Sequence, residues 1–319
     1  MTRERNQVLA RLAARDAASL VGMAAEVSAS TDREKALLRV FGVLGVPIIQ
    51  AYPVLKRLTE HLQTADLTIN FAAYKFFNRQ PRGTGYVSQF EGGNKWGGSS
   101  YITARDEAEE AMFDYSGTKA KPASVHADVL RRLRQFGKKS ELTFEPSIRP
   151  KYAALNYAQL LHGSAGQWGK SHMVLKEHVK HNATYVHTDS FDEAGNARLR
   201  AALGDKTASF LNMDRLIANM PDTMLKALYD AYKGVSLGTA LQVPGLGDTA
   251  YIEAHVHGGL NFDRDIAKIV ISNHELTNAE ADLKNIALKN KSFKVVSSKT
   301  LQETFEKFAR KYGIQVVLV

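Results

Sequence analysis

The chain of 319 residues contains no cysteine. This absence excludes structural disulfides, thiolate ligation of a metal and a cysteine nucleophile, and it fits work in a reducing compartment. Long apolar runs are missing too, because two glycines and two prolines interrupt the longest uncharged stretch, 40–55. A membrane-spanning helix needs about 20 apolar residues in succession. We therefore expect a soluble protein with no membrane span.

The amino terminus lacks the apolar core of a secretory signal peptide, since three of the residues 1–6 are charged. If the protein is exported, we expect a route other than the general secretory one. Hydrophobic residues at 44% and charged residues at 24% are ordinary for a globular protein. The net charge of +9 leaves nucleic acid, an anionic membrane surface and an anionic small ligand open as partners.

Positive charge is concentrated in the segment 119–151, which carries nine basic and three acidic side chains. A solvated helix face and a docking site for an anionic partner both explain such a run. Proteins that bind single-stranded nucleic acid interleave basic residues with aromatic ones that stack on bases. The segment has no regular pattern of that kind, so we expect no nucleic-acid partner.

The first part of the chain predicts helices. Apolar residues follow helical spacing over 3–27, and a capping box at 31–34 begins a second helix near Asp32. A third helix is expected over 48–62, bent at Pro53. We assign 1–66 to an N-terminal helical region, which is either a layer packed on the main domain or a cap that recognises a partner.

From residue 67 onward short strands alternate with helices and polar loops, which predicts an α+β domain over 67–319. Strands are expected at 67–71, 86–91, 149–156, 169–175, 184–188, 251–257, 269–271, 293–296 and 314–319. Helices are expected at 105–113, within 205–234 and at 301–312, with Asp222 as an N-cap and Gly234 just beyond a helix end.

The stretch 249–259 carries the most unusual pattern. Alternation places Tyr251, Glu253 and His255 on one side of a strand and apolar residues on the other. Polar groups on a strand that otherwise resembles core are costly unless they are paired or used. Three interpretations remain open: a metal pair made by His255 and His257, a structural salt bridge of Glu253, or a catalytic carboxylate at Glu253.

The third interpretation fits the cleavage of a glycosidic bond in a nucleotide. Such reactions pass through a transition state in which the sugar becomes cationic, and a fixed carboxylate stabilises that charge. Anionic phosphates require arginine nearby, for which Arg149 and Arg105 are candidates. Ser171 is a candidate for hydrogen bonding in the pocket, and Tyr152, Phe90 or Tyr86 for stacking on a base or nicotinamide ring. No HExxH or similarly tight spacing supports a metal site.

Five stretches, taken in order, resemble the bacterial mono-ADP-ribosyltransferase family that includes the CteC-type effectors, which ADP-ribosylate a threonine of ubiquitin. The stretches are 85–92, Arg105 with Glu109 and Phe113, 149–156, 168–175 and 251–258. They lie within residues 67–275 and place an arginine, a serine and a glutamate on successive predicted strands, similar to the Arg–Ser–Glu layout of these enzymes.

The resemblance implies a split-sheet ADP-ribosyltransferase fold with NAD as co-substrate. In that family's terms Arg149 holds the NAD phosphates or ribose, Asn156 lines the same pocket and Ser171 is the strand serine. Glu253 is then the catalytic glutamate at the nicotinamide ribose, and Arg105 is a further pocket residue.

Two departures from the family pattern bear on the acceptor. The run 71–75 is less polar than in relatives, and Tyr251 stands where arginine-specific transferases carry Gln or Glu. The second departure suits a hydroxyl acceptor. The resemblance thus implies a monomeric effector, delivered to the host cytosol by a non-classical route, that modifies a threonine of ubiquitin and blocks ubiquitination. The rival predictions are a non-catalytic basic docking module and a metal-dependent hydrolase.

Overall fold

The computed structural model describes residues 31–78, 83–87, 109, 112, 149–190, 206–237, 251–289, 291 and 293–319. The predicted helix at 3–27, most of the strand at 86–91, most of the helix at 105–113 and nearly all of the basic segment lie outside the described residues. Two of the predicted site residues, Phe90 and Arg105, also lie outside them.

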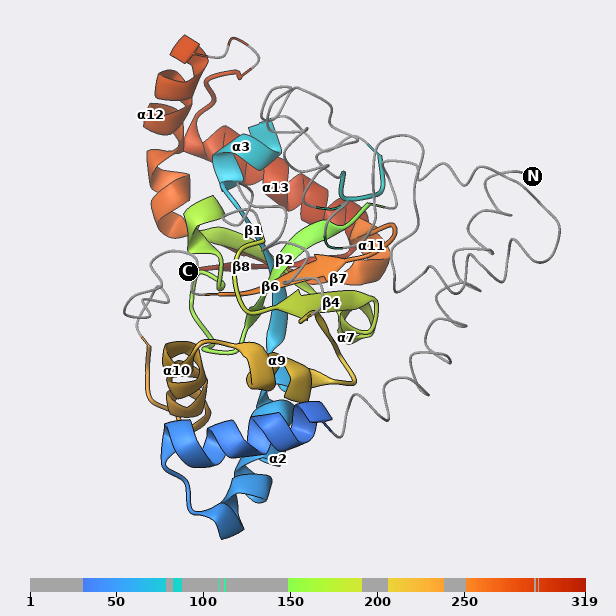
Figure 1. Ribbon diagram of the computed structural model, residues 1–319. Helices are drawn as coiled ribbons and strands as arrows, with labels where there is room; N and C mark the ends of the chain where they lie inside the picture. The colour runs from blue at the N-terminus through green and yellow to red at the C-terminus, as the bar shows by residue number, and fades with distance from the viewer. Residues whose placement is uncertain are drawn as a thin grey trace, which may run out of the picture.

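Eight strands of the described residues form one mixed sheet (Figure 1). The strands are β1 (Asp66–Phe71), β2 (Lys151–Asn156), β3 (Ser171–Leu175), β4 (Ala183–Val186), β5 (Ala208–Ser209), β6 (Ile252–Val256), β7 (Ile266–Ile271) and β8 (Gln315–Leu318). Their order is β5-β4-β6-β2-β1-β3-β7-β8, and all neighbours are antiparallel except β7 and β8. The α+β class is therefore confirmed.

The described helices mostly gather at two ends of the sheet (Figure 1). They are a first helix, Thr31–Leu44, then α2 (Ile48–Thr64), α3 (Ala73–Asn78), the 3-10 turn η3 (Gly166–Trp168), α7 (Glu177–Lys180), α9 (Met213–Asn219), α10 (Asp222–Tyr232), α11 (Phe262–Asp265), α12 (Asn273–Lys289) and α13 (Ser298–Tyr312). Helices α3, α12 and α13 pack on one another, and α2 packs on α9 and α10.

Alternation along the strands gives the sheet two unlike faces. In β1, Leu67, Ile69 and Phe71 belong to the main hydrophobic core, while Thr68 and Asn70 point to the other side. Residues that pair across antiparallel strands share a face, so the neighbouring strands repeat this division. We call the second side the polar face. It includes Asp66, Thr68, Asn70, Tyr152, Ala154, Asn156, His172, Val174, Thr184, Val186, Glu253, His255, Lys268 and Val270.

Most of the predicted elements that fall on described residues are confirmed; one predicted strand is wrong, and one helix of the structure has no counterpart among the predictions. The predicted strand at 293–296 is wrong, because this segment is irregular. The backbone N–H of Lys294 donates to the side-chain oxygen of Asn78, and the Lys294 carbonyl accepts from the side-chain nitrogen of Asn78. Helix α12 was not predicted. Asp222 was expected to cap α10, but it is the first residue of the helix and Pro221 holds the cap position. Gly234 follows the helix end, as expected, with a φ of 79°.

The first helix and α2 form a layer packed against α9. The Asp214 carboxylate of α9 accepts hydrogen bonds from Arg33 Nε at 2.8 Å and from Thr59 Oγ1 at 2.7 Å. Ala36 and Leu58 join the same hydrophobic core as the sheet. The inner side of this region therefore packs on the rest of the described fold.

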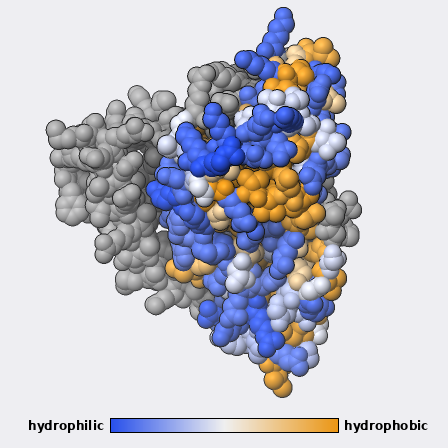
Figure 2. Space-filling view, turned by 180° about the vertical axis from the view of Figure 1, so that it is seen from behind, coloured by the Kyte–Doolittle hydropathy of each residue, from blue (hydrophilic) through white to orange (hydrophobic). Residues whose placement is uncertain are grey.

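The outer side of the same two helices exposes large apolar residues. These are Leu38, Phe41, Ile48, Ile49 and Tyr52. Figure 2 shows apolar side chains at the lower tip of the molecule, where Figure 1 places the start of α2. The inner side of this region thus fits the interpretation as a packing layer, and the exposed outer side fits the interpretation as a partner-recognition cap.

No single helix of the described residues has both the length and the apolar character required to cross a membrane. The first helix and α2 meet that requirement only when they are counted together, and they are bent by 110° at their junction.

Gly169 offers a direct test of how tightly the loop before β3 packs on β1. Its φ is 145°, and a Cβ atom there would lie 2.0 Å from the carbonyl carbon of Phe71. Because both backbone atoms and the dihedral angle oppose a side chain, we expect Gly169→Ala to lower the free energy of unfolding by about 2–3 kcal/mol or more. Urea denaturation measures this change.

The matched control is Gly166→Ala in η3, where a Cβ would meet no atom within 4 Å and φ is not in the left-handed region. This variant should keep the wild-type midpoint within a few tenths of a molar. Equal stability of the two variants would contradict the packing described for Gly169.

Candidate active site

Glu253 lies on the polar face, in β6, between β4 and β2. Only 2% of the residue is exposed. A buried carboxylate is unfavourable unless hydrogen-bond donors replace the lost water. Three donors surround it: His255 Nε2 lies 2.7 Å from Oε1, the Ser190 backbone N–H donates to Oε1 at 3.2 Å, and the Tyr251 hydroxyl donates to Oε2 at 3.2 Å.

Tyr251 is held as a donor to this carboxylate. Burial raises the pKa of its hydroxyl well above the usual range, and the carboxylates of Glu253 and Asp189 raise it further. The phenol consequently stays protonated. Its ring packs with Ala154 of β2 and with Ala165 from the loop that follows β2.

A second group of buried polar residues adjoins the first through two aromatic rings. The rings of Tyr152 and His255 meet edge to face with centroids 5.4 Å apart. The Tyr152 hydroxyl donates to Glu109 Oε1 at 2.8 Å, and Arg149 Nη1 donates to Glu109 Oε2 at 3.1 Å. Glu109 and Arg149 are 1% and 2% exposed. Three of the predicted site residues, Arg149, Tyr152 and Glu253, are thus brought into one connected cluster.

Thr184 of β4 connects His255 of β6 with His257, which directly follows that strand. Its hydroxyl lies 2.9 Å from His257 Nε2 and 3.5 Å from His255 Nδ1. In the part of the chain that the structure describes, no group of three or more His, Cys, Asp or Glu side chains could hold a metal ion. The imidazoles of His255 and His257 therefore share the Thr184 hydroxyl as a hydrogen-bond partner. The described residues provide no third side chain that would complete a metal site with them.

Ser171 is placed away from Glu253. Ser171 pairs with Phe71, which belongs to the apolar face. In the sheet order β6-β2-β1-β3, its strand lies three strand spacings from β6, which is about 14 Å. Its hydroxyl donates to Glu275 Oε2 at 2.7 Å and accepts from the Ser272 backbone N–H at 3.0 Å. These contacts join the start of β3 to α12, and we leave Ser171 out of the candidate site.

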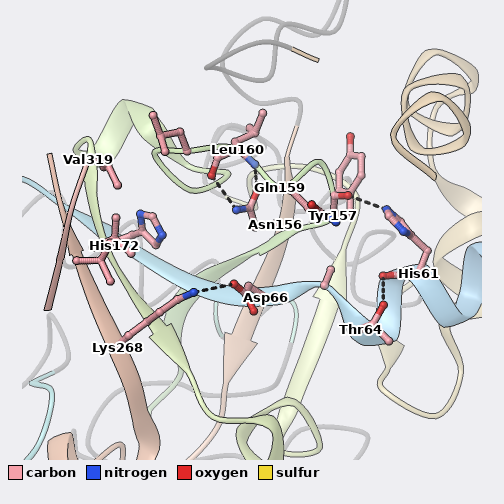
Figure 3. Close-up of a pocket in the computed structure, with 14 residues that line it drawn as sticks. His61, Thr64, Asp66, Asn156, Tyr157, Gln159, Leu160, His172, Lys268 and Val319 are labelled. Atoms are coloured by element: carbon pink, nitrogen blue, oxygen red, sulfur yellow. Dashed lines mark hydrogen bonds and ion pairs between the residues drawn. The ribbon is translucent and has the colours of Figure 1, made fainter. Parts of the chain in front are cut away.

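Asn156 shares the polar face with Glu253 but is engaged with the turn that follows β2. Its side-chain nitrogen donates to the Leu160 carbonyl at 3.0 Å, and its oxygen accepts from the Leu160 N–H at 2.9 Å. It also lines a cleft of about 370 Å³ with Asp66, His172 and other residues (Figure 3). Neither Glu253 nor Arg149 lines this cleft.

Sequence reasoning missed several members of the buried cluster. Glu109 was noted only as part of a resembling stretch, and its role as the partner of both Arg149 and Tyr152 depends on tertiary contact. Ser190 and Asp189 follow β4 in a loop, and no local pattern marks them. The Ser190 hydroxyl is buried and has no hydrogen-bond partner within the described residues.

The cluster defines a buried acid site on the polar face of an α+β sheet. A sequence model of the family described as "Protein of unknown function (DUF3626)" matches residues 82–314. The chain belongs to this family. A search of curated proteins gives no match. The match covers β2 to α13, so it includes Arg149, Tyr152 and Glu253.

The cleft in Figure 3 contains a histidine whose charge state links pH to stability. Burial, aided by Lys268 and His162, lowers the pKa of His172 to about 4. In the unfolded chain a histidine has a pKa of about 6.5. Between these values the unfolded chain binds a proton that the folded protein does not. The contribution of His172 to the folding free energy is therefore fully present above pH 6.5 and is lost as the pH falls toward 4.

We expect this group to remove about 2–3 kcal/mol of folding free energy between pH 7 and pH 4.5. Urea denaturation at both pH values, on wild type and on His172→Gln, measures it. The variant should lose less stability than wild type over this interval. It should keep part of the loss, because burial also lowers the pKa of His187 to about 4. Identical pH dependence in both proteins would contradict the assignment.

Proposed function

We propose that this protein is an NAD-dependent mono-ADP-ribosyltransferase that modifies a hydroxyl side chain of a host protein, with a threonine of ubiquitin as the expected acceptor. The observation that carries the proposal is the buried Glu253 carboxylate, which three donors orient on the polar face beside the Arg149–Glu109–Tyr152 group. The resemblance of five stretches to the CteC-type family supplies the reaction and the co-substrate.

In the proposed reaction the bond between nicotinamide and ribose breaks, and the bonding electrons leave with the nicotinamide. Positive charge then develops on the ribose, as in other glycosyl transfers. The ionised Glu253 stabilises that charge because its site excludes most water, which strengthens electrostatic attraction. Tyr251 and His255 contribute by holding the carboxylate in one orientation.

Arg149 is proposed to meet the phosphates of NAD, since a guanidinium group matches phosphate geometry. Glu109 positions this guanidinium and joins it to Tyr152 of β2, whose ring contacts the ring of His255. The buried Ser190 hydroxyl beside Glu253 is suited to a polar ligand, because it has no hydrogen-bond partner among the described residues. Arg105 and Phe90 remain proposed pocket residues that lie outside the described part of the chain.

Several finer features of the proposal rest on the family resemblance. They are the split-sheet transferase fold, the monomeric state, the effector role in the host cytosol and the non-classical export route. Asn156 belongs to the proposed NAD site only if the cofactor extends from Glu253 past the turn at Leu160 into the cleft of Figure 3.

The central experiment replaces Glu253 by glutamine and measures nicotinamide release from NAD and label transfer to ubiquitin. Loss of the negative charge should lower both rates on the order of 10²–10³-fold, the usual effect of removing one transition-state contact. Circular dichroism and urea denaturation establish that the variant is folded under the assay conditions.

Glu275→Gln is the matched control, because Glu275 is also a buried carboxylate but accepts from Ala73 N, Lys170 N and Ser171 Oγ at the start of α12. This variant should lose stability and keep the turnover of the folded fraction. Unchanged turnover in Glu253→Gln would remove Glu253 from the mechanism. Loss of wild-type turnover on addition of a chelator would favour the metal-dependent hydrolase instead.

A further inference from the structure

Ser190 stands out among the buried polar groups near Glu253. The residue is 1% exposed, and its backbone N–H donates to Glu253 Oε1 at 3.2 Å. Its hydroxyl group is therefore carried by a residue in direct contact with the carboxylate. Within the described residues this hydroxyl has no hydrogen-bond partner.

A buried hydroxyl without a partner costs free energy, on the order of 1–3 kcal/mol. Folded proteins satisfy most such groups, so each exception requires an explanation. The side chains around Ser190 already have their own contacts: His255 and Tyr251 are both bonded to Glu253. A ligand bound at Glu253 would supply a partner for this hydroxyl.

We infer that Ser190 binds the ribose of the nicotinamide riboside, through the hydroxyl group next to the one that meets Glu253. This inference rests on the proposed function. A ribose presents two neighbouring hydroxyl groups, and Glu253 Oε2 and Ser190 Oγ are two acceptors on adjoining residues of the cluster. With the 2′-hydroxyl on Glu253, next to the reacting carbon, Ser190 takes the 3′-hydroxyl.

The two-acceptor arrangement has a consequence for substrate choice. A site that hydrogen-bonds a substrate hydroxyl rejects analogues lacking it, because its own polar group is then left unpaired. Ser190 would make the site selective for an intact ribose over a deoxyribose at that position.

The test compares Ser190→Ala with Ser272→Ala. Both serines are buried, and both hydroxyls have no partner within the described residues, but Ser272 lies beyond β7 beside Ser171. Removing either hydroxyl should leave the urea midpoint unchanged or raise it, since an unpaired buried group is removed. Isothermal titration with NAD should give a dissociation constant about five- to tenfold higher for Ser190→Ala and unchanged for Ser272→Ala.

An NAD analogue that lacks the 3′-hydroxyl of the nicotinamide ribose removes the other partner of the proposed hydrogen bond, so that protein and ligand changes can be compared in one thermodynamic cycle. It should bind wild type about five- to tenfold more weakly than NAD, and it should bind wild type and Ser190→Ala equally well. A structural defect in Ser190→Ala would weaken both ligands alike.

Two results would overturn the assignment of Ser190. One is wild-type NAD affinity in Ser190→Ala, and the other is a lowered urea midpoint, which would mean that the hydroxyl stabilises the fold. Failure of the wild-type protein to bind NAD at all would instead overturn the proposed function, and the ribose assignment with it.

Discussion

A carboxylate taken out of water must find its hydrogen-bond donors inside the protein, and the donors described for Glu253 come from two segments of the chain. Tyr251 directly precedes β6 and His255 lies in it, while Ser190 follows β4. Ser190 reaches the carboxylate because β4 pairs with β6 and ends beside Glu253. The order of these central strands is thus tied to the solvation of one side chain.

The same principle recurs at two other buried carboxylates. Glu109 accepts from Arg149 and Tyr152, and Glu275 accepts from three groups at the starts of α3 and β3. Each of these glutamates joins segments that are far apart in sequence. The contacts of Glu109 and Glu275 account for a structural role. Glu253 differs in its place on the polar face, where His255 connects it to the Arg149–Glu109–Tyr152 group.

Local pattern predicted β6 and its two faces because alternation is a property of neighbouring residues. The position of Ser171 relative to Glu253 could not be predicted in that way, since it depends on register across three strand pairs. The run 293–296 is rich in residues that favour a strand, yet the side chain of Asn78 binds its backbone and no strand forms. Helix α12 was missed because only three of its residues are buried, and one of them is the charged Glu275.

The pleat of β6 carries the core and the acid cluster on alternate positions of five consecutive residues. Inserting or deleting one residue upstream in this strand would exchange the two sets, placing Glu253 among the aliphatic side chains and Ile252 among the polar ones. The strand therefore tolerates length changes only in steps of two. Variation in this family is expected to accumulate by substitution in β6, with gains and losses of residues confined to the loops on either side.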